Sequence, residues 1–127
     1  MANYLDCYLT VKRWMNNQRQ GKNLGDYFSQ YPYEKVAIYG AGDIGKLLYE
    51  EMKGSGCRVA YFIDKCAEGQ AQEQGIKVIL PDEIRQSESV DAIIISSLAD
   101  YEEIARDISE RGILLPLVFL RDAIYEV

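Results

Sequence analysis

The stretch KVAIYGAGDIGKLLYEEM, residues 35–52, decides the fold. The apolar run from Val36 to Tyr39 predicts a buried β-strand, and residues 43–53 place apolar side chains at helical spacing. Three glycines, Gly40, Gly42 and Gly45, come between the strand and the first turn of the helix. A strand, a glycine-rich turn and a helix in this order predict the start of a βαβ unit.

Strand and helix patterns continue to alternate after this unit. Further strands are predicted at residues 58–64, 76–80, 91–96 and 114–120, with short helices after Pro81 and after Asp100, where Glu103 suggests a capping box. Val59, Tyr61 and Ile63 are expected on one strand face. Pro116 predicts that the last strand lies at a sheet edge or starts at that proline. The pattern predicts an α/β fold with a doubly wound, parallel five-stranded sheet in the order 3-2-1-4-5.

The N-terminal segment predicts one extra helix over residues 3–18. Its apolar side chains recur every three or four residues, at Tyr4, Cys7, Tyr8, Val11, Trp14 and Met15. We therefore divide the chain into an N-terminal helix with its connector, 1–33, and an α/β domain, 34–127. The apolar stripe has two interpretations: packing on its own domain, or a homodimer surface, since amphipathic aromatic residues are favoured at interfaces.

Composition excludes several classes of function. The chain has 127 residues, 48% of them hydrophobic, which suits one packed core. The net charge of -6 argues against nucleic acid as a partner. There is no histidine, and the three cysteines form no CxxC pair, so we expect no metal site and no histidine-activated nucleophile. No window approaches the about 20 apolar residues of a membrane span, so we expect a cytoplasmic protein without a membrane partner.

The glycine turn matches the G-x-G-x-x-G pattern of dinucleotide-binding proteins. In that pattern the first glycine permits a tight turn, the second lets a pyrophosphate approach the backbone, and the third lets the helix pack closely on the strand. Amide groups at the start of the helix then face the phosphate. The predicted cofactor-binding residues are Gly40, Ala41, Gly42, Asp43, Ile44, Gly45, Asp64, Lys65, Ser96 and Ser97.

Asp64 ends the second predicted strand, 19 residues after Gly45. An acid at this place accepts a hydrogen bond from the adenosine ribose and favours NAD over NADP. Lys65 weakens that preference, and Asp43 weakly opposes a phosphate. The alternatives stay open: the glycines could serve only to close the fold, Asp64 could cap its own loop, and Ser96 and Ser97 could cap strand ends.

We predict no catalytic residues. Two Tyr-x-x-x-Lys matches, Tyr31 with Lys35 and Tyr49 with Lys53, have the spacing of the short-chain dehydrogenase proton donor. The first match precedes the first strand and the second lies on the first helix, whereas a catalytic pair would follow the fourth strand. As an isolated chain the protein is not expected to be an enzyme.

Four segments carry a resemblance to a known family: VAIYGAGDIGKLLYEEM, GCRVAYFIDK, GIKVILPDEI and VDAIIISSLADYEEIARDISERGI. They resemble the small Rossmann-like domains of capsular and surface-polysaccharide biosynthesis proteins. Those domains are similar to the N-terminal parts of nucleotide-sugar dehydratases and sugar acetyltransferases. The resemblance covers residues 35–122 and leaves the N-terminal helix without a role.

The resemblance implies a nucleotide-binding module that is not catalytic alone. NAD is the expected cofactor, while NADP, CoA or a nucleotide sugar remain alternatives. The implied setting is nucleotide-sugar or surface-polysaccharide metabolism. Two other classes stay open: a component of an NAD-dependent nucleotide-sugar oxidoreductase or dehydratase that acts with a partner, and a structural dimerisation module without a ligand.

Overall fold

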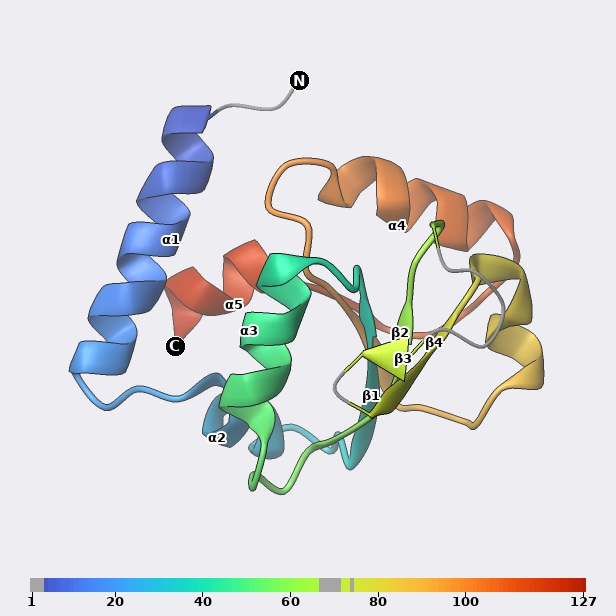
Figure 1. Cartoon of the computed structure of the whole chain (residues 1–127), viewed down its shortest axis with the longest axis horizontal. Coiled ribbons are helices and arrows are strands. Elements are labelled where there is room, and N and C mark those ends of the chain that lie inside the picture. Colours follow the sequence, from blue (N-terminus) through green and yellow to red (C-terminus); the bar gives the residue numbers. More distant parts are fainter. Residues whose placement is uncertain (1–3, 67–71, 74) are drawn as a thin grey trace.

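A computed structural model describes residues 4–66, 72–73 and 75–127 and confirms the α/β fold with its N-terminal helix (Figure 1). The helices are α1 (Tyr4–Arg19), α2 (Leu24–Ser29), α3 (Asp43–Met52), the 3-10 helix η1 (Pro81–Gln86), α4 (Tyr101–Glu110) and α5 (Leu120–Glu126). The strands are β1 (Lys35–Tyr39), β2 (Arg58–Ile63), β3 (Gln72–Glu73), β4 (Ile76–Ile79), β5 (Ala92–Ile95) and β6 (Leu117–Phe119).

The five parallel strands lie in the order β4-β2-β1-β5-β6, which is the predicted order 3-2-1-4-5. β6 forms the edge and begins after Pro116, whose carbonyl accepts a hydrogen bond from the amide of Ile93 at 3.0 Å. The polar stretch 65–75, which lies between the second and third predicted strands, contains β3, which pairs antiparallel with β4. Residues 67–71 and 74 of that stretch lie outside the described residues.

Helices cover both faces of the sheet. Side chains from α1, α2, α3 and α5 pack together on one face, around Trp14, Phe28, Leu48 and Ile124. On the other face α4 and η1 bury Ile108 and Ile84. The near-continuous apolar run of β5 is buried at every position, as expected for a central strand covered on both sides.

The prediction that Val59, Tyr61 and Ile63 share one face of β2 was wrong. Val59 packs with the α3 side, whereas Tyr61 and Ile63 pack with the α4 side. The register between β1 and β2 shifts by one residue between Val36 and Ala37, which pair with Val59 and Tyr61. A bulge of this kind reverses the side to which later side chains point.

The apolar stripe predicted for α1 does not form one face. Trp14 is buried, but Tyr4, Tyr8 and Met15 are 88%, 61% and 59% exposed. The inward face combines Trp14 and the partly buried Cys7 and Val11 with two buried polar residues, Thr10 and Asn17. Their polar groups are satisfied: the Thr10 hydroxyl donates to the Asp6 carbonyl at 2.9 Å, and the Asn17 amide donates to the Ile124 carbonyl at 2.8 Å.

Other local features refine the sequence predictions. The helix after Pro81 is a 3-10 helix, and Asp100 stands at the N-cap of α4 without a side-chain capping bond. Gly112 follows the C-cap of α4 and has a positive φ of 78°. The last residues form α5, which was not predicted, and α5 begins at Leu120, the last residue of the predicted fifth strand. Among the described residues, no helix combines the length and apolar character needed to cross a membrane.

Candidate functional site

A cleft of about 630 Å³ opens at the carboxyl ends of the parallel strands. This edge faces upward in Figure 1, where β1 leads into the start of α3. It is also the point between β1 and β5 at which the strand order changes direction, and doubly wound sheets bind ligands there. The cleft is lined by nine of the ten predicted site residues: Gly40, Gly42, Asp43, Ile44, Gly45, Asp64, Lys65, Ser96 and Ser97. Ala41 is the exception.

Two of the three glycines are required by the fold itself. Gly40 has a φ of 110°, which side chains rarely adopt, and a Cβ there would overlap the Ser96 hydroxyl. A Cβ on Gly45 would overlap the carbonyl oxygen of Gly40. These glycines let the strand turn sharply and let α3 start close to the sheet, whether or not a ligand is present.

Gly42 differs from the other two glycines. A Cβ at this position would meet nothing within 4 Å, and its φ of -80° suits any residue. Packing therefore gives no reason for a glycine here. Gly42 is the N-cap of α3, no side chain caps that helix, and the residue lines the cleft. The first amide groups of a helix have no partner within it, so the start of α3 offers donors and positive potential to an anion.

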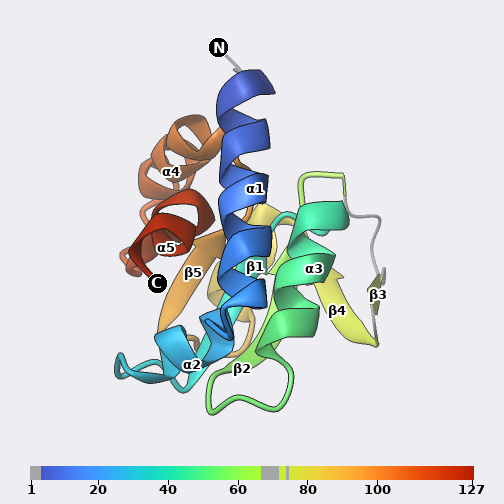
Figure 2. The same cartoon turned by 90° about the vertical axis from the view of Figure 1, so that its left-hand side faces the viewer.

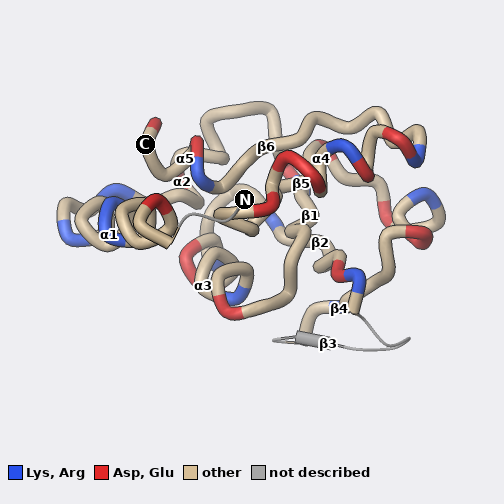
Figure 3. Tube along the Cα trace, turned by 90° about the horizontal axis from the view of Figure 1, so that it is seen from above, with Lys and Arg blue, Asp and Glu red and all other residues tan. Residues whose placement is uncertain are grey.

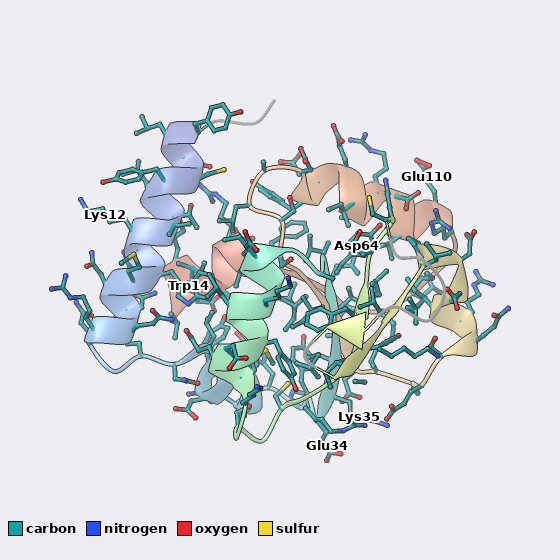
Figure 4. All side chains as sticks on the ribbon, in the orientation of Figure 1. Lys12, Trp14, Glu34, Lys35, Asp64 and Glu110 are labelled. Carbon is teal, nitrogen blue, oxygen red and sulfur yellow. The ribbon has the colours of Figure 1, made fainter. Side chains whose placement is uncertain are left out.

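Asp64 lies beyond the carboxyl end of β2 and lines the cleft (Figure 4). One carboxylate oxygen accepts from the amide of Ala41 at 3.0 Å, and the other accepts from the amide of Cys66 at 2.8 Å. The side chain therefore holds the glycine turn and its own loop, as the capping alternative expected. A carboxylate has about four lone-pair sites, so both oxygens retain capacity for a ribose hydroxyl.

The two serines have different surroundings. Ser96 is buried, and its hydroxyl donates to the carbonyl of Tyr39 at 2.9 Å, with the Gly40 carbonyl at 3.3 Å. It fastens β5 to the start of the glycine turn. Ser97 is half-buried, and its hydroxyl accepts from the amide of Asp100 at 3.0 Å, so it supports the loop before α4. Both contacts fit the strand-end interpretation.

Tyr39 also lines the cleft, and its hydroxyl is buried with no hydrogen-bond partner among the described residues. Burial, together with the nearby charge of Asp107, raises the pKa of Tyr39 to about 12. The phenol is therefore neutral at physiological pH and poorly suited to act as a base.

Carboxylates outnumber cations around the cleft. Asp43, Asp64, Asp100 and Glu103 line it, against Lys65. Figure 3 looks onto this edge and shows the acidic residues at the start of α4. These acids repel an anion from the start of α4, although that helix also lacks a capping side chain. The first turn of α3 carries one acid, Asp43, whereas the first turn of α4 carries two, Glu102 and Glu103.

Sequence reasoning missed one wall of the cleft. Besides the nine predicted residues and Tyr39, the cleft is lined by seven residues: Cys7, Val11, Leu98, Ala99, Asp100, Glu103 and Ile104. The position of the loop after β5 could have been predicted from the topology, because its residues directly follow Ser97 in the sequence. Cys7 and Val11 belong to α1, and no signal in the sequence indicated that α1 reaches this edge.

Among the described residues, no group of three or more cysteine, aspartate or glutamate side chains could hold a metal ion. The cleft presents the start of α3 with its backbone amides, the carboxylate of Asp64, which already accepts two hydrogen bonds, and apolar side chains. This arrangement can bind an anionic ligand with an apolar portion.

Fold and cleft together define a doubly wound α/β protein with a glycine turn at its topological switch point. The chain belongs to the family described as C2185-like, N-terminal, which matches residues 32–115. The matched region runs from the residues before β1 to the segment before β6, so it includes the glycine turn and leaves out α1. No curated protein matches the chain.

Proposed function

We propose that this protein binds a nucleotide ligand in the cleft, with the phosphate at the start of α3 and NAD(H) as the favoured ligand. The observation that supports it most is Gly42. Its neighbours Gly40 and Gly45 are explained by packing, whereas the absence of a side chain at Gly42 is explained by a ligand that approaches the backbone.

Size and electrostatics agree with this assignment. The cleft of about 630 Å³ falls within the range of small-molecule and cofactor sites, about 300–1,000 Å³. The amides at the start of α3 favour the pyrophosphate, and Asp64 stands where the adenosine ribose of NAD would lie. The same carboxylate disfavours the additional phosphate of NADP.

Nucleotide-sugar or surface-polysaccharide metabolism is the setting that we propose from the sequence resemblance alone. We propose binding, and presentation of the ligand to a partner, as the activity. Hydride transfer needs a substrate held against the nicotinamide and a group that moves a proton. With Tyr39 neutral and the chain without histidine, the described cleft offers carboxylates and one lysine for such work.

Calorimetric titration of NAD into the wild-type protein and Gly42→Val tests the proposal. The branched side chain should fill the open space at the turn and abolish binding while the fold persists. Gly54→Ala is the control: a Cβ at Gly54 would also meet nothing within 4 Å, and this residue lies at the other end of α3. Its φ of 80° makes alanine mildly destabilising there, so unchanged NAD affinity in Gly54→Ala separates lost binding from lost stability. Equal affinity in wild type and Gly42→Val would place the ligand elsewhere.

A structural dimerisation module is the second candidate, and one observation favours it. The first half of α1 exposes Tyr4, Leu5, Tyr8 and Leu9. A second copy of the chain would present the same surface, so one two-fold axis could cover both. Val11 does not belong to this surface, since it packs against its own core. Dimerisation is compatible with ligand binding, because the exposed side chains do not line the cleft.

A further inference from the structure

α1 stands beside the cleft rather than apart from the α/β domain. In Figures 1 and 2 its first half extends beyond the carboxyl ends of the strands, on the side where the cleft opens. Cys7 and Val11, one helical turn apart, line the cleft together with Gly42 and Ile44 at the start of α3. The same two side chains pack, half-buried, against the core cluster that contains Trp14 and Leu98.

The α1 side of the cleft differs in chemistry from the opposite end. Cys7, Val11, Ile44 and Leu98 contribute apolar surface to it, beside the carboxylates of Asp100 and Glu103, whereas Asp64 and Lys65 bring charge at the end of β2. A ligand with its ribose at Asp64 and its phosphates at α3 would carry its remaining end group toward this apolar wall. An uncharged or planar group gains from covering such a surface.

Specific contacts hold α1 in this position. Asp6 precedes Cys7 and forms a two-bonded ion pair with Arg121 of α5, at 3.0 and 3.1 Å. Further along α1, the Trp14 indole donates to the Glu51 carboxylate at 2.9 Å, and Figure 4 shows Trp14 turned toward α3 while Lys12 points away. The Asp6 pair is the bidentate contact nearest to the cleft-lining turn.

We propose that α1 forms one wall of the ligand site, that Cys7 and Val11 contact the end of the ligand distal to Asp64, and that the Asp6–Arg121 pair strengthens binding by holding this wall in place. The inference rests on the proposed nucleotide function. Because a docked α1 adds contacts to the bound ligand, any change that undocks it lowers affinity.

Protection of the Cys7 thiol tests the contact directly in the full-length chain. Cys66→Ser removes the exposed thiol. Cys57 should not react with the reagent, because it is 1% exposed and burial raises its pKa to about 11. Alkylation of Cys7 by iodoacetamide is then followed without ligand and with saturating NAD, ADP-ribose or ADP. NAD should slow the reaction at least about fivefold, and ADP should slow it least, because ADP lacks the distal end.

A second thiol on the same helix is the matched control. Met15→Cys, placed in a chain with Cys7→Ser and Cys66→Ser, puts a thiol at an exposed position that does not line the cleft. Its alkylation rate should not change with NAD. Equal slowing at both positions would indicate a general effect on α1 and would overturn the contact.

Affinity tests the role of the ion pair. Asp6→Asn keeps the size of the side chain and removes its charge, and should weaken NAD binding about fivefold or more by calorimetry. Asp122→Asn is the control, since Asp122 also lies near Arg121, at 3.9 Å, but belongs to α5. Unchanged affinity in Asp6→Asn would remove the positioning role.

The outcomes separate the two proposals. If calorimetry shows that NAD binds but the alkylation rate of Cys7 does not change, the α1 wall is contradicted and the nucleotide function is not. If calorimetry detects no binding of NAD, ADP-ribose, ADP, CoA or UDP-glucose, the nucleotide function is contradicted, and so is the proposal that α1 forms a wall of the ligand site.

Discussion

Replacing the glycines of the turn one at a time separates the requirements of the fold from those of the ligand. In Gly45→Ala the new Cβ would overlap the carbonyl oxygen of Gly40, which is backbone and cannot rotate away. Overpacking of this kind costs about 3 kcal/mol. Better helix propensity of alanine offsets about 1 kcal/mol, which leaves a net loss of about 2 kcal/mol.

Gly42→Ala should behave differently. Its Cβ meets nothing within 4 Å, and a less flexible unfolded chain stabilises the protein by about 0.5 kcal/mol. Alanine is a poorer N-cap than glycine by a similar amount, and Gly42 is the N-cap of α3. The two effects cancel, so the free energy of unfolding should stay within about 0.5 kcal/mol of wild type.

Thermal unfolding followed by circular dichroism measures both changes without any ligand. At about 4 °C per kcal/mol for a chain of this size, Gly45→Ala should lower the Tm by about 8 °C and Gly42→Ala should move it by no more than about 2 °C. Equal Tm values for Gly45→Ala and wild type would refute the close approach of α3 to β1. A loss of about 8 °C in Gly42→Ala would give Gly42 a packing role and remove the main support for a ligand at the turn.

Three other predictions concern ligand choice, assembly and chemistry. Asp64→Ala should lower the affinity for NAD more than the affinity for NADP, as measured by calorimetry. Loss of the hydrogen bond to the Ala41 amide weakens the binding of both ligands. An unchanged ratio of the two affinities would therefore contradict selection at the ribose. Sedimentation should show that the wild-type protein is a dimer and that the double variant Leu5→Ser, Tyr8→Ser is a monomer. Leu114→Ser, at an exposed site outside α1, is the control and should remain a dimer. A monomeric wild type would contradict the dimer. We expect no sustained change in absorbance at the reduced nicotinamide band when the pure protein is incubated with NAD and a panel of UDP- and GDP-sugars. Turnover that Gly42→Val abolishes would instead favour the oxidoreductase alternative.

The sheet could be predicted because its signals are local and agree with one another. The run before Gly40, the buried β5 and Pro116 at the edge each fix a strand, and parallel strands joined by helices leave few possible orders. The same order brings Gly42, Asp64 and Ser97 to one edge. Most of the candidate site therefore followed from sequence once the topology was known.

What could not be predicted depends on contacts between distant segments. The inward face of α1 contains Thr10 and Asn17, which a hydrophobic pattern assigns to solvent. Thr10 can be buried because its hydroxyl donates to the Asp6 carbonyl within α1, and Asn17 because its partner, the Ile124 carbonyl, lies at the other end of the chain. The bulge in β2 leaves no mark in the sequence. α5 had a helical signal in Leu120, Ala123 and Ile124, but it is short and directly follows an edge strand.

Native mass spectrometry of freshly purified protein tests the central claim most directly, because it names a retained ligand without choosing one in advance. The account predicts an added mass equal to a dinucleotide, NAD above all, that is present in wild type and absent in Gly42→Val. A bare chain in both proteins, with no mass gained after incubation with NAD, would contradict nucleotide binding at the glycine turn.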